Sequence, residues 1–489
     1  MSTRRALLFS FMDRYAGLTI SIASSMVIAR LLTPGELGVY SVAMVLLGFL
    51  QTLRDFGAGQ YLVQERELDS NRIRAVWTIQ LVTGILFACI AFLAANPVAK
   101  FYADMRIEGV MQIVALTFLV NPFGSLSYAW LTREMRFDSL AIMRFSSNSA
   151  GAIISMILAW QGYGVASLAM GGLGSTFVGA AMGIIFRPSG FPWLPGLSEL
   201  RRVFSFSATV SVQSLLNTLS AAAPDLLLGK LQTMTDAGLF SRAAGLVNMF
   251  THLFADAVHS VAFGALAREA RGEGQVAELF MKATLYMTTV GWTFLLALVV
   301  LAEPLVMLFY GDQWGYAVPL VRWLGVAAIV AAPAMFCGTT LLAMGRSKES
   351  LRATAIDTFQ RLTFCSFGAA INTSFLAACV VASTCITLAI WLAALRRHMP
   401  FRYLRLAAGL FTSGQVALFS TAPLILIAWY TSMVLQLRPL LVLGLCTLVG
   451  TLAFLLGLKL CSHPILDDLV KFLTIARARS GIRAGRGVN

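Results

Sequence analysis

Apolar runs long enough to cross a membrane follow one another along almost the whole chain. Each run comes near the roughly 20 residues that a helix needs to cross the hydrocarbon layer. Only 12% of the residues are charged, against about 25% in a typical soluble domain. One soluble core with a single anchor does not fit this pattern, so the sequence predicts an all-α polytopic membrane protein with about fourteen transmembrane helices. The expected spans are 14–32, 39–55, 75–95, 108–129, 140–160, 164–186, 203–222, 239–260, 279–301, 318–343, 353–371, 373–395, 405–430 and 438–460.

The placement of the cations tests this count. The net charge of +14 could suggest nucleic acid, but the cations lie in short clusters between the apolar runs, so nucleic acid is rejected as a partner. With the N-terminus in the cytoplasm, strict alternation of the spans puts the cations on the cytoplasmic side by roughly four to one. This positive-inside bias predicts that both termini lie in the cytoplasm.

A short turn of the chain occurs twice. ARLLTPGELGVYS (29–41) closes the first span and opens the second, and GKLQTMTDAGLFS (229–241) does the same for the seventh and eighth. The matched pairs include Arg30 and Lys230, Thr33 and Thr233, Glu36 and Asp236, Gly38 and Gly238, and Ser41 and Ser241. Six spans separate the copies, so both enter the membrane in the same direction, which is typical of a parallel repeat.

This repeat predicts the organisation of the chain. We expect two parallel-repeat six-helix lobes over 1–202 and 203–404, two appended C-terminal helices over 405–462, and a basic cytoplasmic tail over 463–489. A ladder of small residues in the sixth span should let neighbouring helices approach closely. Its members are Gly171, Ser175, Gly179 and Gly183.

Three segments of the chain resemble a known family. ASSMVIARLLTPGELGVYSVA (23–43), FLQTLRDFGAGQYLVQERELD (49–69) and LLAMGRSKESLRATA (341–355) are similar to bacterial polysaccharide transporters, the oligosaccharide flippase family. The likeness extends over most of the chain, and it looks closest to exopolysaccharide-type members. The wider superfamily also contains peptidoglycan-precursor flippases and multidrug/cation antiporters.

The resemblance implies a function in the bacterial inner membrane. A member would flip a polyprenyl-diphosphate-linked oligosaccharide from the cytoplasmic to the periplasmic leaflet, for exopolysaccharide, capsule or O-antigen assembly, by alternating access of two lobes. The implied partners are this lipid-linked substrate, membrane lipids, a polysaccharide polymerase with its export machinery, and a coupling proton or sodium ion. No enzymatic site, cofactor or metal is expected.

Two other classes of protein were weighed. A drug or small-cation antiporter of the same fold is the main alternative, and neighbouring glycosyltransferase genes would favour the flippase. A membrane-embedded glycosyltransferase or polymerase fits less well, because it would need catalytic acids in a large loop and the loops here are short.

Cations close to the membrane are the candidate substrate-binding residues, because an exposed charge at mid-membrane is costly. Arg54 suits a diphosphate because its planar fork donates two parallel hydrogen bonds; the alternative is an interfacial arginine paired with Asp55. Arg30, Lys230 and Arg242 are further candidates. For Arg30 and Lys230, the structural alternative is that each snorkels or pairs with the acid six residues on and so fixes the turn.

Span 8 adds a polar stripe. In NMFTHLFADAVHSV, His252 and Asp256 share one helical face with Asn248 and His259. Such a stripe could carry protons, bind sugar hydroxyls, or simply pack against a neighbouring span. In span 11, Asp357 and Arg361 have the four-residue spacing of an ion pair, and we expect them to neutralise each other.

Overall fold

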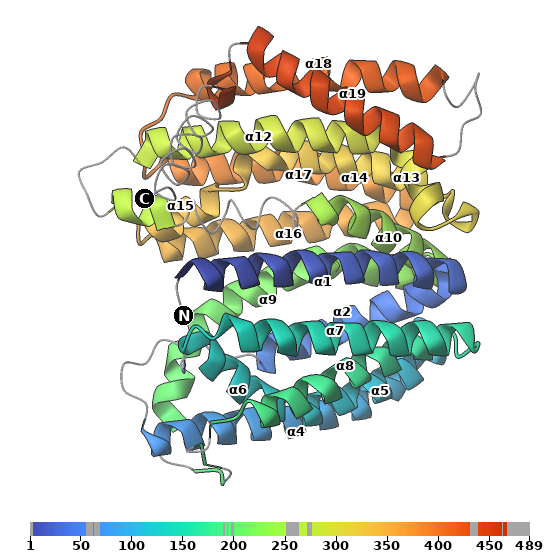
Figure 1. Cartoon of the computed structure of the whole chain (residues 1–489), viewed down its shortest axis with the longest axis vertical. Coiled ribbons are helices and arrows are strands. Elements are labelled where there is room, and N and C mark those ends of the chain that lie inside the picture. Colours follow the sequence, from blue (N-terminus) through green and yellow to red (C-terminus); the bar gives the residue numbers. More distant parts are fainter. Residues whose placement is uncertain are drawn as a thin grey trace, which may run out of the picture. The chain divides into compact units, whose positions relative to one another are not determined.

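The computed structural model describes residues 3–54, 62, 69–188, 191–192, 194–196, 200–250, 264–270, 276–430, 439–461 and 463–466. These residues form helices and connecting turns and include no strand (Figure 1). The all-α prediction is therefore confirmed. The basic tail expected at the C-terminus lies almost wholly outside the described residues.

The helices follow one another in the order that the apolar runs predict. In the first part of the chain they are α1 (Thr3–Leu31), α2 (Pro34–Arg54), α4 (Ser70–Tyr102), α5 (Arg106–Val120), α6 (Pro122–Arg133), α7 (Phe137–Trp160), α8 (Ala166–Ile185), α9 (Leu200–Leu231) and α10 (Met234–Phe250). Then come α12 (Val276–Val300), α13 (Ala302–Phe309), η2 (Asp312–Trp314), α14 (Ala317–Ala331), η3 (Ala332–Ala334), α15 (Cys337–Ala343), α16 (Ser347–Ile371), α17 (Thr373–Arg396), α18 (Tyr403–Tyr430) and α19 (Pro439–Leu460).

The number of spans is tested only in part. Among the described residues, nine helices are long and apolar enough to cross a membrane, or ten if the bent pair α5 and α6 counts as one span. Each of the fourteen expected spans nevertheless overlaps a helix. The multi-pass character is confirmed, and the exact count of fourteen stays a prediction.

The chain divides into two compact units. Unit 1 consists of Met1–Ser241, Phe309–Trp314 and Cys365–Leu376, and unit 2 of Arg242–Leu308, Gly315–Phe364 and Ala377–Asn489. Two short segments from late in the sequence thus belong with the first half of the chain. The lobe boundary at residue 203 rests on the sequence repeat and stays a prediction.

Unit 1 is a helical bundle in which α7 packs on both α1 and α8, α4 packs on α5, and α2 packs on α9 (Figure 1). The expected small-residue contact on α8 is confirmed. A Cβ on Gly171 would lie 1.8 Å from Oγ of Ser155 in α7, and one on Gly183 would lie 2.6 Å from Cα of Gly124 in α6. Larger side chains at these positions would separate the helices.

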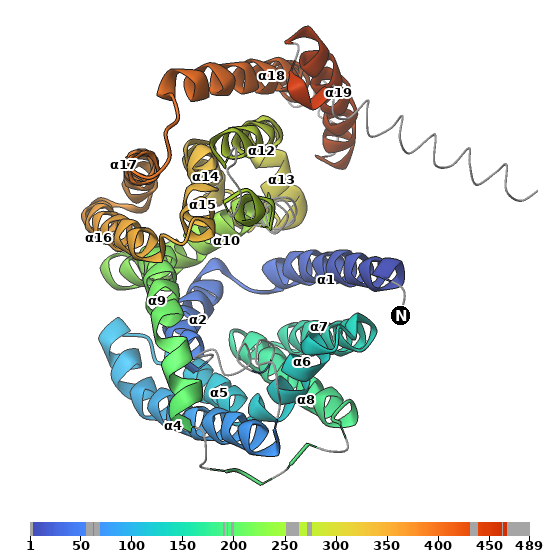
Figure 2. The same cartoon turned by 90° about the vertical axis from the view of Figure 1, so that its left-hand side faces the viewer.

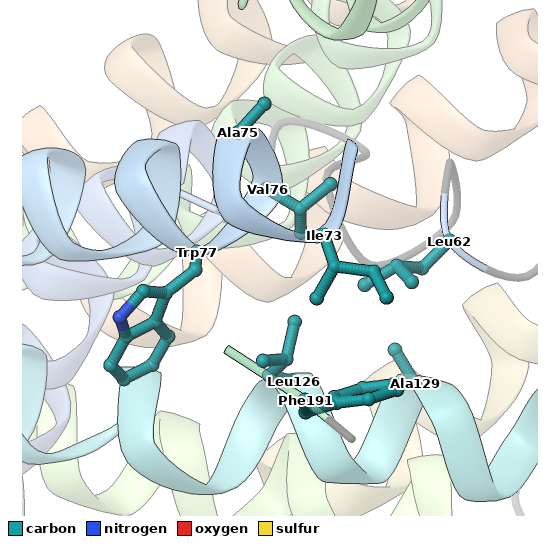
Figure 3. Close-up of a cluster of buried hydrophobic side chains, with 8 residues drawn as sticks. All are labelled: Leu62, Ile73, Ala75, Val76, Trp77, Leu126, Ala129 and Phe191. Carbon is teal, nitrogen blue, oxygen red and sulfur yellow. The ribbon is translucent and has the colours of Figure 1, made fainter. Parts of the chain in front are cut away.

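The connection between α8 and α9 folds back against the start of α4. Phe191 lies in a buried apolar cluster with residues of α4 and α6, together with Leu62 (Figure 3). Gly196 exchanges hydrogen bonds of 2.8 Å with the Thr78 hydroxyl, and the Arg187 guanidinium stacks 5.3 Å from the Trp77 ring centroid. Burial lowers the pKa of Arg187, which follows the end of α8.

Unit 2 contains a bundle in which α12 packs against α14 and α18, and α18 pairs with α19 (Figure 2). A buried polar chain links three of its segments. The Thr289 hydroxyl on α12 lies 2.8 Å from Oγ of Ser413 on α18 and 3.0 Å from Nε2 of His463, which follows α19. These paired groups tie the C-terminal helices to the rest of unit 2.

Candidate functional site

The repeated turn builds the same helix cap twice. The Thr33 N–H and hydroxyl donate to Oε2 of Glu36 at 2.8 and 2.9 Å, and the Glu36 N–H donates back to Oγ1 of Thr33 at 3.3 Å. Thr233 and Asp236 repeat the hydroxyl–carboxylate bond at 2.6 Å and the return bond from the Asp236 N–H at 3.1 Å. The first copy is a reciprocal capping box, and in both copies the threonine hydroxyl accepts from an N–H group at a helix start. The acids therefore serve α2 and α10 as caps.

The two copies meet face to face. A Cβ on Gly38 would lie 1.7 Å from the carbonyl oxygen of Met234, and a Cβ on Gly238 would lie 1.9 Å from that of Pro34. The contacts are reciprocal, as expected when two related segments pack about a local two-fold axis. We call this contact, between Pro34–Ser41 of α2 and Met234–Ser241 of α10, the repeat crossing. Only glycine permits so close an approach of the two backbones.

A hydroxyl–carboxylate chain completes the repeat crossing. The Ser41 hydroxyl donates to Oδ2 of Asp225 in α9 at 2.6 Å, and its oxygen lies 2.9 Å from Oγ of Ser241. Ser41 and Ser241 are register partners in the repeat, whereas Asp225 was not among the residues that the sequence pattern selected. A lone aspartate within an apolar helix was the available signal.

Lys230 lies at the end of α9 and contacts the turn after α4. Its ammonium donates to the carbonyl of Phe101 and lies 4.2 Å from the Phe101 ring centroid. Asp236, its expected acidic partner, instead accepts hydrogen bonds from the hydroxyls of Thr233 and Thr373. Lys230 therefore contacts the end of α4, and not Asp236 as one form of the structural alternative expected.

Arg30 lies at the end of α1, and a late segment of the sequence contacts this end. A Cβ on Gly311 would lie 3.9 Å from Cγ of Arg30. Gln313 Nε2 donates to the carbonyls of Ala29 and Leu32 at 2.6 and 3.2 Å, and Trp314 Nε1 donates to Ala29 at 2.8 Å. Carbonyls that would otherwise lack partners at the end of α1 are thus satisfied.

These two contacts reveal a second repeat that the sequence analysis missed. Lys230 contacts the segment KFYADMR (100–106), and Arg30 contacts the segment LFYGDQW (308–314). We call each of these two segments an FY-turn. Both turns carry a residue with positive φ, +55° at Ala103 and +93° at Gly311. Each copy of the first repeat thus touches the FY-turn that belongs to the other half of the chain. A self-comparison of the sequence at an offset near 208 would have found it.

The FY-turn after α4 is outside the spans and carries an ion pair. Arg106 donates to Asp104 through Nε and Nη2, with a closest distance of 2.6 Å. These bonds hold the pKa of the Asp104 carboxyl below its ordinary value, and they raise the pKa of Arg106. Asp104 therefore stays ionised under physiological conditions and neutralises one cation beside the repeat crossing.

Arg54 is the last residue of α2, at the other end of the helix from the repeat crossing. Its half-buried guanidinium lies 5.5 Å from the ring centroid of Phe118 on α5. Stacking on an aromatic ring is typical of the planar guanidinium, whose fork of N–H donors matches the geometry of a phosphate. Asp55, its alternative partner, lies outside the described residues.

Of the remaining candidate residues, only Arg242 lies among the described residues. Arg242 is half-buried on α10, where unit 2 begins. His252, Asp256 and His259 lie outside the described residues. The structure therefore brings Arg30 and Lys230 to one end of unit 1 and separates them from Arg54, and their substrate-binding role stays a prediction. Within the described ranges, no three His, Cys, Asp or Glu side chains form a group that could hold a metal ion.

In unit 2, Asp357 has partners other than the expected one. It accepts hydrogen bonds from Gln360 Nε2, at 2.9 Å, and from the Thr387 hydroxyl on α17. Across the described part of the chain, no ion pair joins Asp357 to Arg361. The expected four-residue pair was wrong, because α17 supplies a hydroxyl and an adjacent amide turns towards the carboxylate.

The helical spans and their order define the class of the protein: it is a polytopic membrane protein with the fold of the MurJ and MATE transporters. A solved structure of the lipid II flippase MurJ in an inward closed conformation aligns with 96% of this chain and 100% of its own, with a TM-score of 0.77 and 13% identity. An inward-facing multidrug resistance MATE transporter aligns with 80% of this chain and 95% of its own, with a TM-score of 0.63.

The sequence identifies the family. Residues 27–319 match the profile of the polysaccharide biosynthesis protein family, so the chain belongs to that family. The succinoglycan biosynthesis transport protein ExoT of Rhizobium meliloti is 25% identical over 311 residues, which cover 63% of this chain and 62% of ExoT. The teichuronic acid biosynthesis protein TuaB of Bacillus subtilis is 23% identical, with 61% and 62% covered.

A third relative extends the match. The lipopolysaccharide biosynthesis protein WzxC of Escherichia coli is 21% identical, and 70% of each chain is covered. The chain thus spans about 62% of the length of ExoT and TuaB. The family resemblance stated from the three segments is confirmed.

Proposed function

We propose that this protein flips polyprenyl-diphosphate-linked oligosaccharides from the cytoplasmic to the periplasmic leaflet of a bacterial inner membrane, for exopolysaccharide, capsule or O-antigen assembly. Family membership carries the proposal, because the family is named for polysaccharide biosynthesis and the relatives for succinoglycan biosynthesis transport and lipopolysaccharide biosynthesis. The likeness to a lipid II flippase supports a fold that can move a lipid-linked sugar.

The mechanism we propose is alternating access of two lobes with both termini in the cytoplasm, without a catalytic step. A polyprenyl diphosphate carries negative charge that loses its hydration in an apolar layer, and fixed donors must replace it. We propose Arg54 as such a donor, and Arg242, His252 and Asp256 remain candidates that the sequence suggests. A polymerase and export machinery would receive the product.

The test is truncation of Arg54. Arg54→Ala should abolish or strongly reduce polysaccharide export, and Arg54→Lys should restore it only in part, because a point charge lacks the bidentate fork. Export in cells and flipping of a defined lipid-linked sugar in proteoliposomes would be measured at equal amounts of membrane protein. Arg352→Ala is the matched control, because Arg352 is exposed and forms an ion pair with nearby Glu349.

Normal flipping by Arg54→Ala would remove Arg54 from the substrate path. Loss of the protein from the membrane would instead support a structural role at the end of α2. The same proteoliposomes separate the antiporter from the flippase. Uptake of a cationic drug driven by an ion gradient, without flipping of any sugar lipid, would contradict the proposed function.

A further inference from the structure

Asp225 holds an unusual place at the repeat crossing. It lies on α9, three residues after the expected seventh span (203–222), and its carboxylate accepts a hydrogen bond of 2.6 Å from the Ser41 hydroxyl. Because Ser41 has one hydrogen, it donates this hydrogen to Asp225 and accepts a bond from Ser241, whose oxygen lies 2.9 Å away. The Asp225 carboxylate on α9 is therefore connected through Ser41 to Ser241, which is the register partner of Ser41 in the other repeat copy.

The charge of Asp225 has no local cation. Throughout the described part of the chain, no lysine or arginine forms an ion pair with Asp225. The 2.6 Å distance from Ser41 lies in the range of O–H···O⁻ bonds, which are roughly twice as strong as neutral ones. An ionised carboxylate that is half-buried between apolar helices loses part of its hydration, and it is a natural site for a proton.

The helices around Asp225 carry other titratable and charged groups. On the halves nearest the repeat crossing these are Glu36 and Tyr40 on α2, Lys100 and Tyr102 on α4, Lys230 on α9, and Asp236 and Arg242 on α10. Most have described partners elsewhere. Glu36 is held by Thr33, Asp236 by Thr233 and Thr373, and Lys230 by Phe101.

Tyr102 is the neighbour on α4. Its hydroxyl donates to the carbonyl of Leu226, the residue after Asp225, at 3.4 Å. It is therefore directed at the α9 backbone. Among the described residues, the carboxylate accepts from the hydroxyl of Ser41 in the first copy of the repeated turn, and Ser41 lies 2.9 Å from Ser241 in the second copy.

We propose that Asp225 is a proton-binding site that controls the repeat crossing. Ionised Asp225 holds Ser41 by a charge-assisted bond and keeps the two repeat copies together. Protonation replaces this bond with a weaker neutral one and favours separation of α2 from α10 at this end. The inference rests on the proposed function, because it assigns the coupling ion of that transport cycle to one residue.

The test measures a distance across the repeat crossing. Spin labels at Leu31→Cys and Leu231→Cys, two exposed register partners, would be attached to the full chain in a cysteine-free background in lipid nanodiscs. Electron–electron resonance distances would be compared at about pH 8 and about pH 5.5, a range in which partly buried carboxylates take up protons. We expect a second, longer distance to become populated at the lower pH.

Variants assign this response to Asp225. Asp225→Asn, which is neutral at every pH, should populate the longer distance at both values and lose the pH response. Asp236→Asn is the matched control, because this carboxylate also accepts from hydroxyls at the same end, and it should retain the response. Ser41→Ala keeps Asp225 but removes its donor, so it should populate the longer distance already at about pH 8.

Three outcomes would overturn the proposal. The first is that Asp225→Asn keeps the pH response of the wild-type protein. The second is that the label-to-label distance in this variant stays short at both pH values. The third is that the longer distance appears when sodium replaces choline in the buffer but does not appear at the lower pH. The measurement uses no sugar lipid. An Asp225-dependent response in a protein that flips no lipid-linked sugar would therefore contradict the proposed function and leave this inference standing.

Discussion

Gly38 and Gly238 are the residues at which the repeat copies touch through backbone atoms. The clash distances of 1.7 and 1.9 Å for an added Cβ involve carbonyl oxygens, which cannot turn aside as a flexible side chain can. The matching glycines thus have a physical reason to recur, independent of any role in binding.

This contact predicts the effect of single methyl groups on α2. Gly38→Ala should lower stability by about 1–3 kcal/mol, the cost of forcing extra atoms into a packed interior. Gly48→Ala, on the same helix with nothing within 4 Å of the added Cβ, should be neutral or stabilise by about 0.5–1 kcal/mol. Thermal unfolding of the purified protein in detergent would measure both, and equal melting temperatures would contradict the close crossing.

The cations of the repeated turn can be found from the sequence, but their contact partners can be found only from the tertiary structure. Arg30 and Lys230 match in sequence, and each meets an FY-turn at the end of a different helix. The internal repeat identified the pair, but the partners lie far away along the chain, 129 positions for Lys230 and Phe101 and 281 positions for Arg30 and Gly311. No local rule connects residues at that separation.

At the scale of helices, the hydroxyl of Thr387 links α17 to α16 by hydrogen bonds. Thr387 on α17 donates to Asp357 on α16 and is itself 3.1 Å from Gln360 Nε2. Gln360 also reaches the carbonyl of Ser383 at 3.3 Å. The Asp357 carboxylate therefore takes its hydrogen bonds from Gln360 and Thr387 within unit 2, rather than from Arg361.

Two substitutions distinguish these arrangements. Thr387→Val keeps the shape but removes the donor, and it should destabilise the protein by about 1–3 kcal/mol, the cost of an unsatisfied polar group. Arg361→Gln should change stability by no more than about 0.5 kcal/mol. Melting temperatures and protein levels in the membrane would be compared. The reverse order of effects would restore the ion pair predicted from the sequence.

At the scale of the whole molecule, the parallel repeat requires that each connection between spans lies on a particular side of the membrane. Alternation of the spans puts the connection after α7 and the η2 turn in the periplasm. Reporter fusions after Gly162 and Asp312 should therefore report the periplasm, and fusions after Arg136 and Arg397 should report the cytoplasm. One inverted reporter would contradict the even offset between the repeat copies, on which the parallel relation depends.

The sequence by itself determined the class of fold, the order of the helices, the family and the first repeat. Those properties follow from apolar runs near membrane length and from residues matched in register, which are local or periodic features. It also identified the small-residue face of α8, because a four-residue ladder places glycines on one side of a helix.

Only the tertiary structure decided which side chains meet. It joined Asp225 to Ser41 and Ser241, placed Gln313 and Trp314 on the carbonyl end of α1, and gave Asp357 a hydroxyl partner on α17. The physical reason is that a polar group in an apolar layer takes the best donor or acceptor that packing brings within reach. Packing brings together helices that are far apart in the sequence, so spacing along one helix cannot identify that partner.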